Sequence, residues 1–219
     1  TYQPGHLLVD YTRTMMGSLL FRPAPSRIGM IGLGGGSQVK FIHRHLPKTR
    51  LEVVENNAAV IALRRRFRIP DNDARLQVIH GDGAHFVRDN PGRYDILLVD
   101  AYDVTGIPQA LSSQQYYDDC RAALAPDGVM ASNLFCADAD RHIERMRRSF
   151  GKRRVLVVEE ARMSNRVAFA WVGDPLPGDA FEVAAQLARV APGARRSLAP
   201  VLQEVARALR AQRVSLTPA

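Results

Sequence analysis

The sequence predicts an α/β fold, built on a mostly parallel, doubly wound sheet that ends in an antiparallel hairpin. Two observations lead to this prediction. Short apolar segments of strand length alternate with segments in which apolar residues recur at helical spacing. Two further apolar segments then follow one another across a short loop, which is the pattern of an antiparallel pair. Strands as apolar as these are typical of a parallel sheet that is covered by helices on both faces.

Three strand–helix units open the pattern. The strands are expected at 27–32, 50–55 and 75–82, and the helices at 37–46, 58–67 and 84–90. Pro47 ends the first of these helices, because proline disfavours helical backbone in the residue before it. Pro91 and Gly92 form a turn after the third helix.

Two more units and the hairpin complete the pattern. The strands are expected at 94–101, 129–135, 153–160 and 166–173, and the helices at 112–124 and 138–149. Ser112 or Ser113 can cap the helix that follows them. This order of elements is that of the AdoMet-dependent methyltransferase-like fold, a Rossmann-like architecture.

The composition excludes several classes of protein. The chain has 219 residues and a net charge of +8, without an apolar run of the roughly 20 residues that a membrane span requires. No secretory leader is visible, so we expect a cytoplasmic protein; the absence of an initiator Met leaves open an upstream segment. Cys120 and Cys136 lack metal-ligand spacing and the histidines form no ligand pattern, so free thiols and no metal are expected. Arginine clusters indicate solvated helix faces, with a surface for a polyanion such as RNA as the alternative.

A glycine-rich loop follows the first strand. It contains Gly32, Gly34, Gly35 and Gly36. Glycine lets a backbone turn tightly and come close to a ligand, and the N-terminus of the next helix attracts negative charge. The loop therefore predicts a nucleotide site, although it departs from the pattern G-x-G-x-x-G of dinucleotide sites.

Two acids at the ends of the next strands narrow the choice of nucleotide. Glu55 lies 19 residues after Gly36, close to the spacing of about 20 residues at which an acid binds ribose hydroxyls. Asp82, followed by Gly83, comes after the third strand and can accept a hydrogen bond from an adenine amino group. Together with the loop, these acids predict adenosine at the carboxyl ends of the strands. The alternatives are a surface glutamate and an ordinary turn aspartate.

Two more acids follow the fourth strand, in the sequence LLVDAYDVTGIP. Asp100 and Asp103 are three residues apart, so both can face one pocket, which Tyr102 can line. Paired carboxylates suit the binding of a cationic amine and the removal of its proton. We expect their like charges to raise one of the two pKa values. A solvated acidic loop is the alternative.

The chain is expected to divide into two parts. Residues 1–174 would form the nucleoside-binding catalytic domain, and residues 175–219 a helical C-terminal extension. The boundary falls in the proline- and glycine-rich segment 174–179. Helices are expected at 180–190 and 197–212, joined by the linker Ala-Pro-Gly-Ala, and they would pack on the domain or on a partner.

The sequence around these motifs resembles the spermidine synthase (polyamine aminopropyltransferase) family, and more closely its bacterial spermidine-synthase-like members. The resemblance covers roughly residues 8–135, and its main segments are YTRTMMGSLLF, RIGMIGLGGGSQVKFI, LEVVE, RLQVIHGDGAHFV and YDILLVDAYD. It implies a role in polyamine biosynthesis, with transfer of an aminopropyl group from decarboxylated AdoMet to putrescine.

The resemblance also implies roles for individual residues. Glu55 would hold the ribose and Asp82 the adenine side, with Pro108 in place of a proline near the adenine. Asp100 would accept the proton of the attacking amine, and Asp103 would help to hold that amine.

Several positions depart from the family pattern. Gly35 stands where the family places an amine-contacting aspartate, and Arg13 falls near a family histidine. The acid that usually follows the strand-end glutamate is Asn57, and the usual Asp-Pro is Asp103-Val104. An acid at position 35 would repel the carboxylate of intact AdoMet, whereas glycine does not, and Arg13 would attract that carboxylate.

These departures leave three functions open. The first is aminopropyl transfer from decarboxylated AdoMet to a polyamine-like amine. The second is an AdoMet-dependent methyltransferase, and the third is a non-catalytic nucleoside-binding module. The family's N-terminal β-hairpin domain, which often mediates oligomerisation, has no counterpart before Thr1, and a homodimer is left open.

Overall fold

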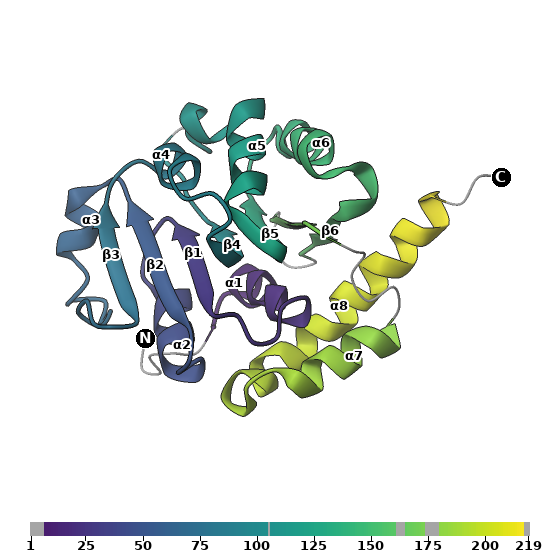
Figure 1. Cartoon of the computed structure of the whole chain (residues 1–219), viewed down its shortest axis with the longest axis horizontal. Coiled ribbons are helices and arrows are strands. Elements are labelled where there is room, and N and C mark those ends of the chain that lie inside the picture. Colours follow the sequence, from purple (N-terminus) through teal and green to yellow (C-terminus); the bar gives the residue numbers. More distant parts are fainter. Residues whose placement is uncertain (1–6, 105, 161–164, 174–179, 217–219) are drawn as a thin grey trace.

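The computed structural model describes residues 7–104, 106–160, 165–173 and 180–216. These residues form a seven-stranded sheet with helices on both faces (Figure 1). The strands lie in the order β3-β2-β1-β4-β5-β7-β6. Strands β1 to β5 are parallel, and β7 lies antiparallel between β5 and β6. The predicted doubly wound sheet and its closing hairpin are confirmed.

The elements alternate along the chain as expected. The strands are β1 (Arg27–Ile31), β2 (Arg50–Glu55), β3 (Leu76–His80), β4 (Tyr94–Val99), β5 (Leu124–Leu134), β6 (Val155–Glu159) and β7 (Arg166–Trp171). The α-helices are α1 (Asp10–Met15), α2 (Ser37–His45), α3 (Ala58–Ala62), α4 (Gly83–Arg88), α5 (Gln114–Ala123), α6 (Ala139–Phe150), α7 (Ala180–Arg189) and α8 (Pro192–Leu216). Short 3-10 helices are η1 (Met16–Leu20), η2 (Gln109–Leu111) and η3 (Lys152–Arg154).

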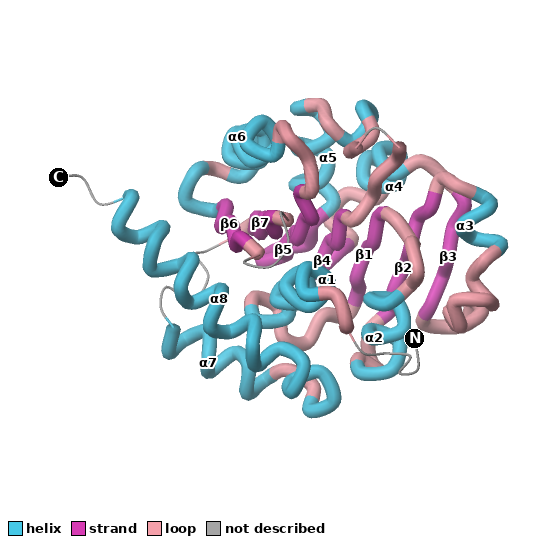
Figure 2. The backbone as a smooth tube through the Cα atoms, turned by 180° about the vertical axis from the view of Figure 1, so that it is seen from behind, coloured by secondary structure: helices cyan, strands magenta, loops and turns pink. Residues whose placement is uncertain are grey.

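Each face of the sheet has its own hydrophobic core. Helices α4, α5 and α6 cover one face, and α1, α2, α7 and α8 cover the other (Figures 1 and 2). Strand β4 shows how one sequence serves both cores, since all of its residues are buried. Ile96 and Leu98 join the core beside α2 and α8, whereas Leu97 and Val99 join the core beside α5 and α6. Neighbouring side chains of a strand point to opposite faces, so the four residues from Ile96 to Val99 are all apolar without alternation.

The C-terminal helices share a core with the sheet. Val183 of α7 and Val201 and Val205 of α8 are buried and belong to the same core as apolar residues of β1 and β4. Helix α8 comes very close to η1, because a Cβ atom at Gly17 would lie 2.8 Å from Val201 Cγ1. The described part of the extension therefore packs on the domain. Among the described residues, no helix combines the length and apolar character needed to cross a membrane.

Helix α3 is shorter than predicted. It ends at Ala62, and the chain continues through turns in which Leu63 and Phe67 are 41% and 40% exposed. Val60 and Ile61 still pack against the core, but Leu63 and Phe67, on which the predicted extension to residue 67 depended, do not.

The predicted turn before the fifth strand lies within β5. The β4 residue Tyr94 pairs with Leu124, whereas Ile96 pairs with Val129, so the intervening residues of β5 bulge out of register. Likewise, Pro192 begins α8 instead of serving as a linker, because proline is well tolerated at the first position of a helix. The segment 174–179 and most of the hairpin loop lie outside the described residues.

Candidate active site

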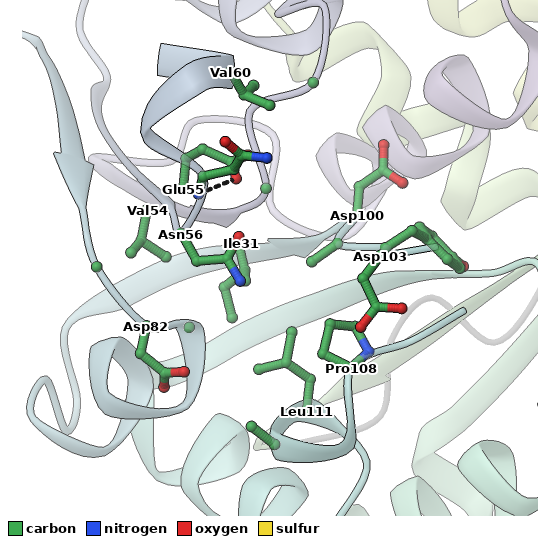
Figure 3. A pocket seen from close by; sticks show the side chains of 18 of the residues that line it. Ile31, Val54, Glu55, Asn56, Val60, Asp82, Asp100, Asp103, Pro108 and Leu111 are labelled. Atoms are coloured by element: carbon green, nitrogen blue, oxygen red, sulfur yellow. Dashed lines mark hydrogen bonds between the residues drawn. The ribbon is translucent and has the colours of Figure 1, made fainter. Parts of the chain in front are cut away.

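A cavity of about 590 Å³ lies at the carboxyl ends of the first four strands (Figure 3). The predicted residues that line it are Gly32, Gly34, Glu55, Asp82, Gly83, Asp100, Tyr102, Asp103 and Pro108. Ile31, Val54, Val60 and Leu111 add apolar surface. The fold therefore brings most of the predicted site together, because parallel strands end at one edge of the sheet.

The glycine loop has two halves with different roles. Gly32 has a φ of +93°, and a Cβ atom there would lie 2.1 Å from the Asp100 carbonyl oxygen. Gly32 and Gly34 line the cavity, whereas Gly35 and Gly36 do not. Gly36 has a φ of +65° and starts helix α2. The space around Gly35 is open, so its lack of a side chain is not required by packing.

Glu55 ties the glycine loop to the start of α3. Its Oε2 accepts a hydrogen bond from the Leu33 N–H, and its Oε1 accepts one from the Asn57 N–H, both at 2.9 Å. A carboxylate oxygen has further acceptor capacity, so Glu55 can also accept hydrogen bonds from ligand hydroxyls. The Asn57 side chain caps α3 by accepting a hydrogen bond from the Ala59 N–H at 2.9 Å. Asn57 thus has a structural role where the family pattern has an acid.

Asp82 caps α4 and also lines the cavity. Its Oδ1 accepts hydrogen bonds from the N–H groups of Ala84 and His85 at 2.8 and 3.0 Å. Its Oδ2 takes no part in this cap. A Cβ atom at Gly83 would lie 2.5 Å from Ile31 Cγ2, so glycine is needed where α4 begins against β1. Asp82 therefore caps the helix, as an ordinary turn aspartate would, and also lines the cavity.

Asp100 is a half-buried acid that follows β4. Its Oδ2 accepts a hydrogen bond from the Tyr11 hydroxyl at 3.2 Å, and its Oδ1 accepts one from Asn133 Nδ2 at 2.9 Å. Burial raises the pKa of Asp100, and these two hydrogen bonds oppose the rise. We expected like-charge repulsion from Asp103 to raise a pKa; the rise at Asp100 instead comes from desolvation. Figure 3 shows why: the two carboxylates point in different directions, with that of Asp103 toward Pro108.

Tyr102 braces the site with its hydroxyl group. The hydroxyl donates to the Asn133 carbonyl at 2.5 Å and accepts from the Phe135 N–H at 2.7 Å. The hydroxyl therefore joins the loop after β4 to the end of β5, and Tyr102 lines the cavity as predicted.

Sequence reasoning missed several residues of the site, among them the polar residues Tyr11, Asn133 and Asn165 around Asp100. Tyr11 lines the cavity and contacts Asp100. The Asn165 side chain donates a hydrogen bond to Asn133 Oδ1 at 2.8 Å. Asn165 directly precedes β7, so the hydrogen bonds that hold Asp100 in place reach the start of that strand. The signal that could have identified Asn133 is the pair of polar residues, Ser132 and Asn133, within the mostly apolar segment VMASNLF.

Arg13 lies outside this cavity. It donates to the Leu7 carbonyl at 2.9 Å and lies 3.4 Å from Asp10. It lines a separate, acidic cavity of about 280 Å³ with Glu160 and Glu204. The expected attraction of a nucleoside carboxylate by Arg13 is therefore not supported by its position.

The fold and the cavity define a methyltransferase-like α/β protein with acids at the ends of its parallel strands. The chain belongs to the spermine/spermidine synthase family, since the model of the spermine/spermidine synthase domain matches residues 9–150.

Curated relatives agree with this assignment. The polyamine aminopropyltransferase of Neisseria meningitidis serogroup A is 37% identical over 176 residues, which cover 78% of this chain and 66% of the relative. The polyamine aminopropyltransferase of Chromobacterium violaceum is 35% identical over 175 residues, which cover 78% and 67%. The chain thus spans about two thirds of the length of these relatives.

Solved structures share the fold. Human methyltransferase-like protein 13 in complex with SAH has a TM-score of 0.74 and 21% identity, covering 89% of this chain and 93% of that one. A spermidine synthase in complex with the transition state analogue AdoDATO has a TM-score of 0.63 and 21% identity, covering 74% and 60%. At these identities the likeness concerns the fold alone.

Proposed function

We propose that the chain transfers an aminopropyl group from decarboxylated AdoMet to an amine of the polyamine type. The observation that carries the proposal is the Asp100 carboxylate, which is desolvated enough to raise its pKa, bound by two side-chain donors and located in the same cavity as Asp103. Family membership and the polyamine aminopropyltransferases among the relatives support the same reaction.

One end of the cavity suits a nucleoside. Glu55 offers two oxygens whose positions are fixed by backbone N–H groups. The apolar side chains of Ile31 and Leu111 line the cavity together with Asp82 and Pro108, and they suit the faces of a purine ring. Gly32 and Gly34 let the backbone come close to the ligand.

The reacting end suits a cationic amine. In the reaction, the amine nitrogen forms a bond to the carbon attached to the sulfonium, and the carbon–sulfur bond breaks. The electron pair of that bond remains on sulfur, which becomes the neutral thioether of methylthioadenosine. Asp100 takes the proton from the amine, and its raised pKa makes it a better proton acceptor than an ordinary aspartate. Asp103 balances the remaining positive charge of a polyamine.

The supports of Asp100 fit this role. Burial and the nearby Asp100 charge raise the pKa of Tyr11, so its hydroxyl remains a hydrogen-bond donor at neutral pH. Asn133 cannot ionise and donates to the other oxygen of the carboxylate. Both groups orient the carboxylate without competing for the proton.

The second candidate, an AdoMet-dependent methyltransferase, rests on Gly35. No side chain there discriminates against the carboxylate of intact AdoMet. Gly35 does not line the cavity, however, and Arg13 lies elsewhere, so this candidate has less support than aminopropyl transfer.

The test is product formation with two alternative co-substrates. The chain is incubated with putrescine and either decarboxylated AdoMet or AdoMet, and nucleoside products are separated by chromatography. We expect methylthioadenosine from the decarboxylated form. S-adenosylhomocysteine from AdoMet would favour the methyltransferase, and binding without any product would favour a nucleoside-binding module.

A further inference from the structure

A cysteine, an aspartate and a histidine meet where β5 ends and α6 begins, outside the candidate active site. The ligand atoms of Cys136, Asp138 and His142 all lie within 4.8 Å of one another. Asp138 is the N-cap residue of α6, and His142 lies one helical turn later on the same side of the helix. We propose that these three residues bind a divalent transition-metal ion of the zinc type, with a fourth position open to water.

His142 is held as a metal ligand should be. The ring is buried, and its Nδ1 lies 2.7 Å from the hydroxyl of Tyr117, which belongs to the neighbouring helix α5. The other ring nitrogen, Nε2, then faces Asp138, and it lies 3.7 Å from Asp138 Oδ1. A ligating imidazole usually has its other nitrogen fixed by such a partner. Burial is the main cause that lowers the pKa of His142, which keeps the ring neutral.

The donor set matches zinc in chemistry and in size. Thiolate, imidazole and carboxylate are the three ligand types of protein zinc sites. Zinc–ligand bonds of about 2.0–2.3 Å place tetrahedral ligands roughly 3.3–3.8 Å apart. The ligand atoms here lie up to 4.8 Å from one another, so binding requires them to move closer by about 1 Å. Asp138 is exposed and Cys136 is half-buried, so rotation of these two side chains can supply it.

Burial and the neighbouring charges limit the affinity of the site, because they raise the pKa of the Cys136 thiol and place arginines near His142. The Cys136 thiol interacts with the Asp138 carboxylate, and the metal would replace the thiol proton, which passes to the solvent. The ligand set then carries two negative charges. Arg141 and Arg145 lie near His142, and Arg166 lies near Cys136. Arg166 is already paired with acids of α6 and β6.

Cobalt provides the direct readout, because a Co²⁺–thiolate bond gives a charge-transfer absorption band. The metal-free chain is titrated with Co²⁺, and Zn²⁺ is then added to displace it. We expect one ion per chain, a thiolate band and displacement by Zn²⁺. The absence of that band would overturn the proposal.

Variants separate this site from adventitious binding. Cys136→Ser should remove the band, whereas Cys120→Ala, a change of the other cysteine, should retain it. Tyr117→Phe keeps the aromatic ring and should weaken Zn²⁺ affinity by roughly 10–100-fold. A band that survives in Cys136→Ser, or equal affinities in Tyr117→Phe and the parent chain, would contradict the proposal. Thermal unfolding of each variant, followed by circular dichroism, verifies that it is folded.

Discussion

The acids at the ends of β2 and β4 face one cavity but have different surroundings. Glu55 accepts hydrogen bonds from two backbone N–H groups, whose positions are set by the fold. Asp100 instead accepts from the side chains of Tyr11 and Asn133, in a setting where burial raises its pKa. Fixed backbone donors suit a group that binds, whereas a desolvated carboxylate suits a group that takes up a proton. We infer a division of labour between binding at β2 and proton transfer at β4.

Gly32 links the two acids, so its replacement should have the largest effect. Gly32 donates its N–H to the Val54 carbonyl and lies against the Asp100 carbonyl. Gly32→Ala combines a strained φ of +93° with a backbone clash, and should lower the free energy of unfolding by about 3 kcal/mol or more. Urea denaturation measures the loss. Gly35→Ala is the matched control, since its surroundings are open; equal losses in the two variants would refute this view of the loop.

Glu55→Gln should impair binding and stability together. A glutamine has one acceptor oxygen and an NH₂ group, so one of the two backbone N–H donors loses its partner. The expected loss is about 1–3 kcal/mol in unfolding free energy. We also expect at least tenfold weaker binding of decarboxylated AdoMet in calorimetry. Glu144→Gln, at an exposed position of α6, should leave both quantities unchanged, and unaltered affinity in Glu55→Gln would remove the ribose role.

Asn133→Ala should alter the proton-transfer end of the cavity. The Asn133 hydrogen bond lowers the pKa of Asp100, so its removal should raise that pKa further. In a plot of the transfer rate against pH, the limb on the acidic side should therefore move to higher pH. Stability should fall by about 2 kcal/mol, because Asn165 also loses a partner. Asn165→Ala should give a smaller shift of the same sign; a limb that does not move in Asn133→Ala would contradict the support of Asp100.

Asp100→Asn should have the smallest effect on stability, with the sign opposite to that of Glu55→Gln. Because the folded-state pKa of Asp100 is raised, the carboxyl group contributes stability at low pH and loses that contribution as pH rises through the folded value. The Tyr11 hydroxyl, unlike a backbone N–H group, can turn to accept a hydrogen bond from the new amide NH₂ group, so neither present donor loses its partner. The variant should therefore gain stability at pH 7, by no more than about 1 kcal/mol. The difference should disappear in acid below the ordinary aspartate pKa of about 3.9. Urea denaturation at both pH values checks the sign, and a loss at pH 7 would show that desolvation is not the dominant cause.

Much of the fold could be predicted because its signals are local. Strand β2 has the predicted bounds, since its apolar residues continue to the strand-ending glutamate. Helix α3 was predicted too long because periodicity does not reveal whether the sheet extends far enough to cover an apolar face. Asp82 and Glu55 were found because acids at the ends of parallel strands must come together.

The remaining parts of the site depend on contacts that are distant in sequence. Tyr11 and Asp100 are 89 residues apart, and Asn165 and Asn133 are 32 apart. Family resemblance drew attention to Arg13, yet residues two apart on a helix point in different directions. Helix α1 therefore directs Tyr11 into the cavity and Arg13 away from it.

The comparison of Asp100→Asn with the parent chain in two assays tests the central claim most directly. Calorimetry measures the affinity for decarboxylated AdoMet, and chromatography measures the rate at which methylthioadenosine forms with putrescine. We predict an affinity within about threefold of the parent and a rate that is lower by roughly 10²–10⁴-fold. A rate within tenfold of the parent, with the affinity unchanged, would contradict the assignment of Asp100 as the proton acceptor.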